Sequence, residues 1–256
     1  MRDHVRHFVS LFAERFRPRG PVFEFGSYQV DGQDRTANLR SLFAGRRYVG
    51  CDMRVGPGVD RVEDVSRLTL ADGSAATVLC LDTLEHVLDV PRAAAEMIRV
   101  LAPGGMIVVS APMDFRIHAF PDDYWRLTPS CLERLLAPLG ANVVGSQGTE
   151  THPHTVLAIG CKSPVPDNFT ERAMLLIGEF DGWCAAQAHQ VPWTTRMKRL
   201  LRTPLQSKGE RRRARDYYAT RFLVHVRASD VPRAHRASPA AAFSSPPTSG
   251  SRLDIS

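Results

Sequence analysis

The pattern of apolar and polar positions changes along the chain. In residues 3–17, apolar side chains recur at helical spacing with charged residues between them, which predicts an amphipathic helix that ends before Pro18. From residue 21 onward, short apolar runs alternate with segments of helical period. The runs are PVFEF, RYVGCD, AATVLCLD and MIVVSAP, and the helical segments are ANLRSLFAG and VPRAAAEMIRVLAPGG. This alternation predicts βαβ units and an α/β fold, with a parallel sheet between two layers of helices.

The second half of the chain begins with TPSCLERLLAPLG, a predicted helix with Thr128 as N-cap and Pro129 in its first turn. The apolar runs ANVVGSQ and HTVLAIGCK follow, with too few residues between them for a parallel crossover, so we expect an antiparallel edge. The segment SPVPDN reads as a linker. We therefore predict four parts: an N-terminal helix (1–18), a main domain (19–162), a helical basic extension (163–230) and a disordered tail rich in Pro, Ser and Ala (231–256).

Composition is ordinary for a packed globular protein, with 43% apolar residues. No apolar run approaches the ~20 residues that span a bilayer, and the first twenty residues carry charges throughout. We expect neither a signal peptide nor a transmembrane helix. The five cysteines are widely spaced without a CxxC pair, which favours a reducing, cytoplasmic setting over a disulfide framework or a zinc site.

Charge is unevenly distributed. Residues 192–236 hold 13 Lys and Arg against three acidic residues, so residues 1–191 carry −4 of the net +6. Such a basic segment is most often a solvated helical face. Two other interpretations remain open: contact with an anionic membrane surface, which would make the protein peripheral to a membrane, and nucleic-acid binding, with Tyr217 and Tyr218 stacking on bases.

The stretch VFEFGSYQVDG resembles a buried strand that ends at a sharp turn. In open parallel sheets, ligands bind beyond the carboxyl ends of the strands, where the strand order reverses. Gly26 directly follows the strand and would let a ligand approach the backbone closely. The dinucleotide fingerprint G-x-G-x-x-G is absent, since Tyr28 and Val30 stand where further glycines would fall. The turn therefore favours a ligand with an adenosine but no phosphates.

Five motifs, VFEFGS, YVGCD, LDTLEHV, RVLAPGG and MIVVSAP, occur in this order with strand–helix alternation. Together they resemble the class I S-adenosylmethionine-dependent methyltransferases, in particular the type 11 group, from about Arg19 to Lys162. The family turn usually reads E/D-x-G-x-G-x-G; this chain keeps Glu24 and Gly26 and lacks the later glycines. The resemblance implies a Rossmann-like, mostly parallel seven-stranded sheet flanked by helices, followed by the basic C-terminal extension, and S-adenosylmethionine as cofactor without a metal.

The resemblance also assigns cofactor contacts to eight positions: Glu24, Gly26, Ser27, Asp52, Met53, Asp64, Leu81 and Asp82. Asp52, at the end of the second strand, would accept hydrogen bonds from both ribose hydroxyls, because a carboxylate offers paired acceptors. Met53 would pack near the adenine and Asp64 would meet its amino group, while Leu81 and Asp82 would face the sulfonium. Judged alone, an acidic residue at a strand end is more often a solvated loop residue or a helix cap.

After the fourth strand, HAFPDDYWRLTP concentrates polar and aromatic side chains in one loop, which favours a substrate pocket. His118 is the first candidate for a catalytic base and Asp123 the second. Tyr124 and Trp125 are candidate walls or a lid, and Arg126 is a candidate anchor for an anionic acceptor. Alternatively, the two aromatic residues pack the loop and Asp123 forms a structural ion pair with Arg126.

Other histidines are given structural roles. His86, in LEHV, is expected to fix the turn that follows it, and the HPH stretch at His152–His154 has no further metal ligands nearby in sequence. The predicted activity is methyl transfer to a small-molecule, glycan or lipid-linked acceptor, with a saccharide favoured because the HAFPDDYWRLTP loop resembles enzymes of cell-surface sugar biosynthesis. The alternatives are an RNA methyltransferase that uses the basic segment and a non-catalytic scaffold that binds S-adenosylmethionine.

Overall fold

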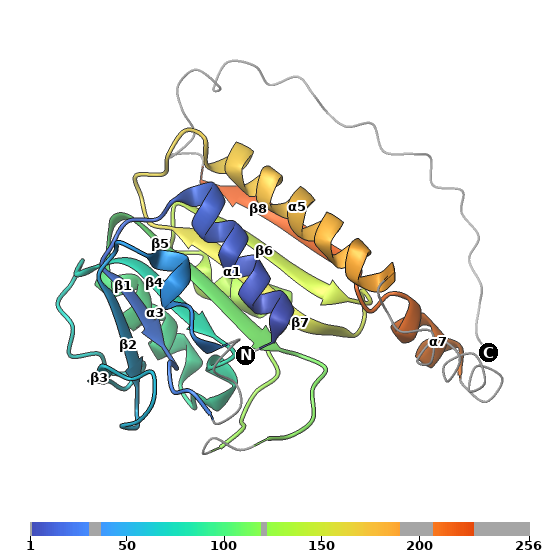
Figure 1. The fold of residues 1–256 in the computed structure, drawn as a ribbon, viewed down its shortest axis with the longest axis horizontal. Helices are drawn as coiled ribbons and strands as arrows, with labels where there is room; N and C mark the ends of the chain where they lie inside the picture. Colours follow the sequence, from blue (N-terminus) through green and yellow to red (C-terminus); the bar gives the residue numbers. More distant parts are fainter. Residues whose placement is uncertain (1, 31–36, 119–121, 190–206, 228–256) are drawn as a thin grey trace, which may run out of the picture.

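The structure is a computed structural model that describes residues 2–30, 37–118, 122–189 and 207–227. In these ranges, eight strands form one sheet: β1 (Val22–Phe25), β2 (Tyr48–Asp52), β3 (Arg61–Val62), β4 (Ala75–Leu81), β5 (Leu101–Pro112), β6 (Ala141–Gly148), β7 (Pro153–Cys161) and β8 (Thr220–Val226). The helices are α1 (Asp3–Phe16), α3 (Val90–Val100), α4 (Pro129–Leu136), α5 (Phe169–His189) and α7 (Lys208–Arg215), with 3-10 turns η1 (Arg40–Phe43) and η2 (Leu84–His86) (Figure 1).

The sheet runs in the order β3-β2-β1-β4-β5-β7-β6-β8. Strands β1 to β5 pair in parallel, whereas β7 is antiparallel to both β5 and β6. The predicted α/β fold and the antiparallel pairing of the two later apolar runs are thus confirmed. The chain moves outward from β1 to β3 and then returns to place β4 on the other side of β1, so the strand order reverses between β1 and β4. This reversal fixes where a ligand crevice opens.

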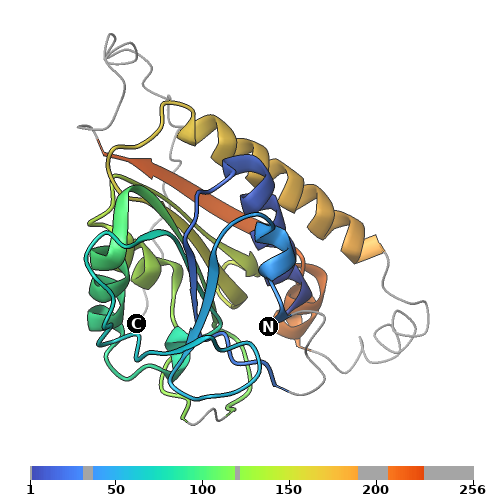
Figure 2. The ribbon, with the colours of Figure 1, turned by 60° about the vertical axis from the view of Figure 1, so that its left-hand side comes forward.

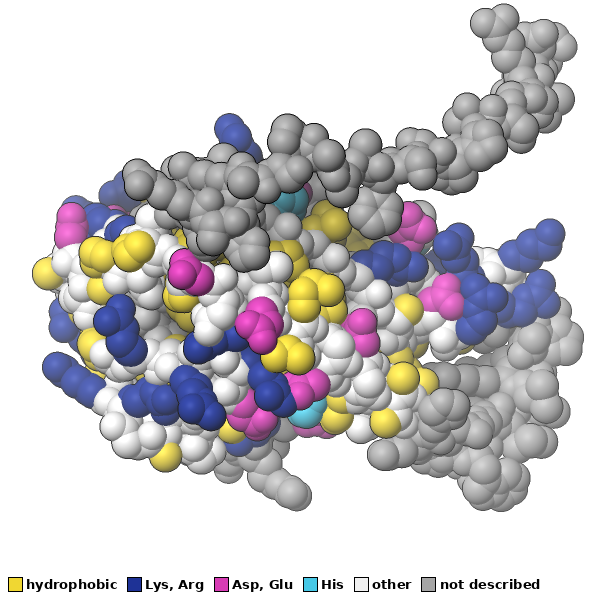
Figure 3. All heavy atoms as spheres, turned by 90° about the horizontal axis from the view of Figure 1, so that it is seen from above, with side chains coloured by type: hydrophobic (Ala, Val, Ile, Leu, Met, Phe, Trp, Pro, Cys, Tyr) yellow, Lys and Arg dark blue, Asp and Glu magenta, His cyan; other side chains and the backbone are white. Residues whose placement is uncertain are grey.

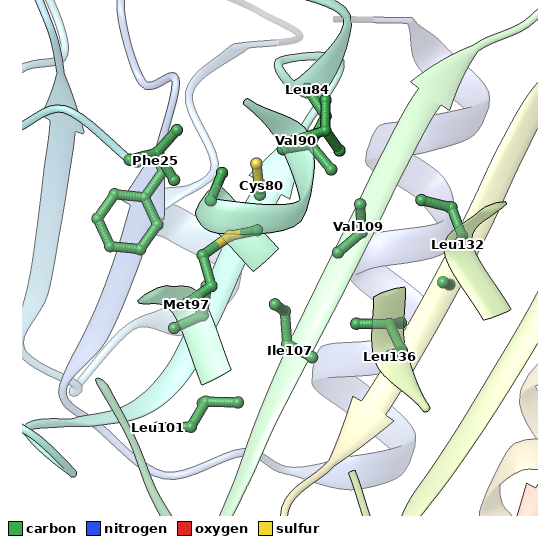
Figure 4. Close-up of a cluster of buried hydrophobic side chains, with 14 of the residues drawn as sticks. Phe25, Cys80, Leu84, Val90, Met97, Leu101, Ile107, Val109, Leu132 and Leu136 are labelled. Carbon is green, nitrogen blue, oxygen red and sulfur yellow. The ribbon is translucent and has the colours of Figure 1, made fainter. Parts of the chain in front are cut away.

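Helices cover both faces of the sheet. Helices α1 and α5 lie side by side on one face (Figures 1 and 2). On the other face, α3 and α4 pack over a core of aliphatic side chains that includes Cys80, Met97 and Leu132 (Figure 4). Successive residues of β4 alternate between the two cores, since Cys80 belongs to the α3 side and Leu79 to the α1 side. Such a doubly covered sheet explains why the strands read as continuous apolar runs.

The N-terminal helix is amphipathic, as predicted, and its aromatic side chains meet those of α5. The ring centroids of Phe8 and Phe180 lie 5.2 Å apart, and those of Phe16 and Phe169 lie 5.4 Å apart. All four side chains are buried. Burial of one such side chain stabilises the fold by about 1.5–3 kcal/mol. This contact holds the start of the chain against the sheet.

Local signals at the helix starts are also confirmed. The Thr128 hydroxyl accepts a hydrogen bond from the Cys131 amide at 3.2 Å, and Pro129 is the first residue of α4. In the same way, the Asp89 carboxylate accepts a hydrogen bond from the Arg92 amide at 3.1 Å at the start of α3. Each cap satisfies one of the free amides that every helix leaves at its N-terminus.

Two expectations need adjustment. In the segment 37–45, predicted as a helix, Ala37 is helical and the 3-10 turn η1 follows at 40–43, with Gly45 after it at a φ of 78°. The sheet has eight strands instead of seven because β8, from the extension, pairs with the edge strand β6. Gly145 of β6 permits this close contact, since a Cβ there would lie 2.1 Å from the Phe222 ring. The extension therefore contributes directly to the sheet.

The predicted disordered tail, 231–256, lies outside the described residues, as do residues 190–206 and 228–230 of the extension. Within the described ranges, no helix combines the length and the apolar composition needed to cross a membrane.

Candidate active site

A pocket of about 470 Å³ opens at the carboxyl ends of β1, β2 and β4, where the strand order reverses. This volume lies within the range of about 300–1,000 Å³ that is typical of small-molecule sites. Seven of the eight positions predicted to contact the cofactor line it: Glu24, Gly26, Ser27, Asp52, Met53, Leu81 and Asp82.

The turn after β1 requires a glycine. Gly26 has a φ of 83°, and a Cβ there would lie 2.0 Å from the Thr83 hydroxyl oxygen. The amides of Gly26 and Ser27 both donate to the Cys51 carbonyl, at 2.9 and 3.0 Å, which joins the turn to β2. The Ser27 hydroxyl lines the pocket, is buried and has no hydrogen-bond partner among the described residues. A buried hydroxyl of this kind is costly unless a ligand satisfies it.

Asp52 ends β2 with its carboxylate held at the pocket wall. Its Oδ2 accepts from the Tyr28 amide at 3.4 Å and its Oδ1 from the Arg54 amide at 3.1 Å. Only 13% of the side chain is exposed. The Arg54 guanidinium lies over the Tyr28 ring, 4.3 Å from its centroid. The carboxylate keeps lone pairs for two neighbouring hydroxyls, which is the arrangement that a ribose needs.

Glu24 is buried at the base of the pocket. Its Oε2 accepts from the Tyr48 hydroxyl at 2.6 Å. Burial raises the pKa of Glu24 to about 7, although the Tyr48 hydrogen bond and the Arg40 charge oppose this rise. The carboxyl group therefore changes its charge near neutral pH.

Asp82 directly follows β4 and has a φ of 48°, at the predicted sulfonium end. Its Oδ1 accepts from the Ser110 hydroxyl at 2.8 Å and faces the Arg2 guanidinium at 3.0 Å. Burial disfavours ionisation, but Arg2 and Ser110 outweigh it and hold the pKa of Asp82 below its usual value. Arg2 also donates to the Thr155 hydroxyl at 2.6 Å, which ties the start of α1 to β7. Sequence reasoning did not identify Arg2, since its partners lie 80 and 153 residues away.

Asp64 is the exception among the predicted cofactor contacts. It is exposed and does not line the pocket, and its carboxylate accepts hydrogen bonds from the amide and hydroxyl of Ser66. This local turn directs the side chain outward. Its neighbours Glu63 and Val65 line the pocket instead. The structure thus places Asp64 outside the pocket, and its contact with the adenine stays a prediction.

The pocket also contains Glu85, which the sequence did not single out as a site residue. Its side chain is fully buried, and neither carboxylate oxygen has a hydrogen-bond partner among the described residues. Burial, followed by the Asp82 charge, raises the pKa of Glu85 to about 8. The only signal in the sequence is its place in LDTLEHV, just beyond the third predicted strand.

His86 has the structural role that the sequence predicts and also lines the pocket. Its Nδ1 lies 2.5 Å from the Asp122 carbonyl oxygen. Because a carbonyl can only accept, Nδ1 carries the hydrogen and Nε2 is left as an acceptor. The amides of Tyr124 and Trp125 both donate to the Glu85 carbonyl, which completes the attachment of the loop to η2.

His118, the first candidate base, lines the pocket beside Glu85 and His86. The His86 and His118 ring centroids are 4.8 Å apart, with the rings edge to face. Asp123, the second candidate, lies behind His118, where its Oδ2 is 3.1 Å from Nδ1 and accepts from the His118 amide at 2.8 Å. Arg126 contacts the same carboxylate at 2.5 and 2.7 Å and holds the pKa of Asp123 far below its usual range.

The loop residues expected to bind substrate brace the loop instead. Arg126 forms the structural ion pair with Asp123, and Trp125 donates through Nε1 to the Val87 carbonyl at 3.0 Å. Tyr124 donates through its hydroxyl to the Asp122 carboxylate at 2.9 Å. None of Asp123, Tyr124, Trp125 and Arg126 lines the pocket, and their contacts agree with the alternative in which they hold the loop.

Part of the basic segment forms α7, which begins with a capping box between Ser207 and Glu210. Figure 3 shows Lys and Arg side chains gathered at the end of the molecule where Figure 1 places α7. Acidic groups lie among them, and Arg212 and Arg215 both contact Asp216. This part of the segment agrees with a solvated helical face whose basic side chains pair with acidic neighbours.

A comparison with known proteins finds a family profile that matches part of the chain. A family profile described as "Methyltransferase domain" matches residues 28–109, about a third of the chain. None of the curated proteins matches the sequence. The matched segment contains Asp52, Asp82 and Glu85 and follows directly on the Gly26 turn. The match confirms the enzyme class and the cofactor that the sequence motifs predict.

Solved structures with a similar fold include two methyltransferases. One is a 1,6-didemethyltoxoflavin-N1-methyltransferase from Burkholderia thailandensis with its substrate and S-adenosylhomocysteine bound, at 20% identity and a TM-score of 0.47 over 62% of this chain and 78% of that one. The other is a possible histamine N-methyltransferase from Thermotoga maritima, at 18% identity and a TM-score of 0.44 over 62% of this chain and 91% of that one.

Proposed function

We propose that this chain, a class I S-adenosylmethionine-dependent methyltransferase of type 11 by its matched domain, methylates a hydroxyl group of a small molecule. Free and lipid-linked saccharides are included among these acceptors. The observation that carries the proposal is a single pocket lined by two unlike groups of residues. We assign the glycine turn and the carboxylate of Asp52 to a cofactor end, and Glu85 and His118 to an acceptor end.

At the first end, the chain binds and orients the cofactor. S-adenosylmethionine supplies a methyl group on a positively charged sulfur, which leaves as a neutral thioether. Asp52 accepts the ribose hydroxyls, and Ser27 offers a buried hydroxyl that lacks a partner among the described residues. Asp82, kept ionised by Arg2, places a negative charge near the sulfonium. Because the leaving group is good, alignment and exclusion of water are the main tasks of these residues.

At the second end, Glu85, His86 and His118 bring three hydrogen-bonding side chains to one wall of the pocket. This density of polar groups suits an acceptor with several hydroxyls, such as a sugar. His118 contacts the acceptor, and Asp123 positions its ring from behind. The resemblance of the loop 118–129 to enzymes of surface-sugar biosynthesis also supports a saccharide.

Substitution of Asp52 tests the cofactor end. We expect Asp52→Asn to weaken S-adenosylhomocysteine binding by about 2–4 kcal/mol, about 30- to 1,000-fold, because two charge-assisted hydrogen bonds are weakened. Isothermal calorimetry measures this, with Asp64→Asn as the matched control, since Asp64 lies outside the pocket. Unchanged affinity in Asp52→Asn would remove Asp52 from the site.

Labelling tests the acceptor class. The full chain is incubated with methyl-labelled S-adenosylmethionine and either a polar metabolite extract, a lipid-linked saccharide fraction or total RNA. We expect label in a hydroxylated product of the first or second fraction. Label in RNA alone would establish the RNA alternative, and cofactor binding without label in any fraction would establish the scaffold.

A further inference from the structure

The acceptor end of the pocket brings together the side chains of Glu85, His86 and His118. One ligand atom from each, a carboxylate oxygen or a ring nitrogen, lies within 4.8 Å of the other two. Two ligand atoms on one metal ion, with bonds of about 2.1 Å, are about 3–4 Å apart. A rotation of the side chains that shortens the widest distance between two of these ligand atoms by about 1 Å would therefore complete a common site.

The two histidines are oriented from behind by oxygen atoms. Nδ1 of His86 lies 2.5 Å from the Asp122 carbonyl, and Nδ1 of His118 lies 3.1 Å from the Asp123 carboxylate. Metal-binding histidines are typically held in this way, with one ring nitrogen on a carbonyl or carboxylate and the other on the metal. The contacts leave Nε2 of each ring for a ligand. For His86, Nε2 is 3.8 Å from the Glu85 Oε1.

The third ligand is the carboxyl group of Glu85. Glu85 is fully buried, and both of its oxygens lack hydrogen-bond partners among the described residues. An isolated carboxylate in such a place is costly, and buried charges are usually paired or bound to a metal. Arg126, a nearby cation, is already paired with Asp123.

We propose that Glu85, His86 and His118 bind a first-row divalent cation, such as Mn²⁺, Fe²⁺ or Zn²⁺, which coordinates the acceptor hydroxyl. Two imidazoles and one carboxylate suit these ions and leave coordination positions open. This inference rests on the proposed function for the identity of the acceptor, but not for the binding of the cation itself. It gives His118 the role of a ligand in place of the role of base that its loop position predicts.

The cation would act on the acceptor by lowering the pKa of its bound hydroxyl, so that the proton is released to water. The oxygen then forms a bond to the methyl carbon while the sulfur–methyl bond breaks. Its electron pair stays on sulfur, giving S-adenosylhomocysteine and the methyl ether. No oxidant or reductant is needed.

Cobalt(II) is the probe for the site, because its visible absorption reports ligation directly. The full chain, freed of metal by chelation, is titrated with Co²⁺, and S-adenosylhomocysteine binding is measured on the same preparation. We expect one Co²⁺ per chain, and at least a tenfold weaker affinity in Glu85→Gln and in His118→Ala. His225→Ala is the matched control, since His225 forms a similar His–Glu contact with Glu133 on the surface.

Three outcomes would overturn the proposal: no stoichiometric Co²⁺ binding by a chain that binds S-adenosylhomocysteine, Co²⁺ binding that is unchanged in both site variants, or equal weakening in the His225 control. Failure of the cofactor site would appear separately, as loss of S-adenosylhomocysteine binding. Retained S-adenosylhomocysteine binding in Glu85→Gln and His118→Ala shows that these variants are folded, so that their loss of Co²⁺ supports the site.

Discussion

The two ends of the pocket are built in different ways. At the cofactor end, Gly26 and Asp52 stand at strand ends, and backbone amides fix both the turn and the carboxylate. At the acceptor end, Glu85 lies in the 3-10 turn η2 and His118 in a loop, and bonds such as those from the Tyr124 and Trp125 amides to the Glu85 carbonyl join the two. The first construction follows from the sheet itself. The second depends on a few contacts between segments that are distant in sequence.

The largest effect is expected at the turn. Gly26→Ala combines a positive φ with a Cβ 2.0 Å from Thr83, whereas Gly45→Ala has a similar φ and no atom within 4 Å of the new Cβ. We expect Gly45→Ala to lower the free energy of unfolding by about 1–2 kcal/mol from backbone strain alone. Gly26→Ala should cost at least about 3 kcal/mol and weaken S-adenosylhomocysteine binding severely. Urea denaturation and calorimetry measure the two effects, and equal losses in both variants would show that the contact with Thr83 is unimportant.

An intermediate effect is expected at the acceptor end. Arg126→Met leaves the Asp123 carboxylate, of which 2% is exposed, without its cation. Breaking a buried pair in this way typically costs about 3–5 kcal/mol, and we expect the loop to rearrange and relieve much of it. Turnover should then fall at least about tenfold, while S-adenosylhomocysteine affinity stays within about twofold.

Steady-state kinetics measures turnover and calorimetry measures S-adenosylhomocysteine affinity, so the two effects of the Arg126 substitution are separated. Arg134→Met, an exposed position on α4, is the control for loss of a surface arginine. A parallel fall in turnover and cofactor affinity in Arg126→Met would show that the two ends of the pocket are not independent.

The same difference explains what the sequence could predict. Gly26, Asp52 and the Thr128 cap follow from local rules, since a glycine at a turn, an acid at a strand end and a threonine before a proline each act on neighbouring residues. Arg2 and Glu85 could not be found in this way. The partners of Arg2 are 80 or more residues away, and the burial of Glu85 depends on a loop that closes over η2.

The loop residues show most clearly what could not be predicted from the sequence. Trp125 and Arg126 have the chemistry of a substrate pocket, but Trp125 bonds to carbonyls 37 and 38 residues earlier, and Arg126 pairs with Asp123. The composition of the loop predicts a functional role, whereas only the fold shows which side chain faces the pocket. His118 does so, while its neighbours hold it in place.

The effect expected at Glu24, at the base of the cofactor end, appears only in the pH dependence of stability. Its pKa is raised to about 7, so between about pH 4.5 and 7 the unfolded chain releases a proton that the folded chain retains. The free energy of unfolding therefore falls as pH rises through this window, by at most about 1.4 kcal/mol per pH unit from this group, and the slope ends above pH 7. Glu24→Gln should remove that slope, because the amide does not titrate and its oxygen can still accept from Tyr48. Urea denaturation from pH 4.5 to 8 measures the difference from the wild type, with exposed Glu171→Gln as control, and identical pH slopes in wild type and Glu24→Gln would show that the carboxyl group is ionised throughout.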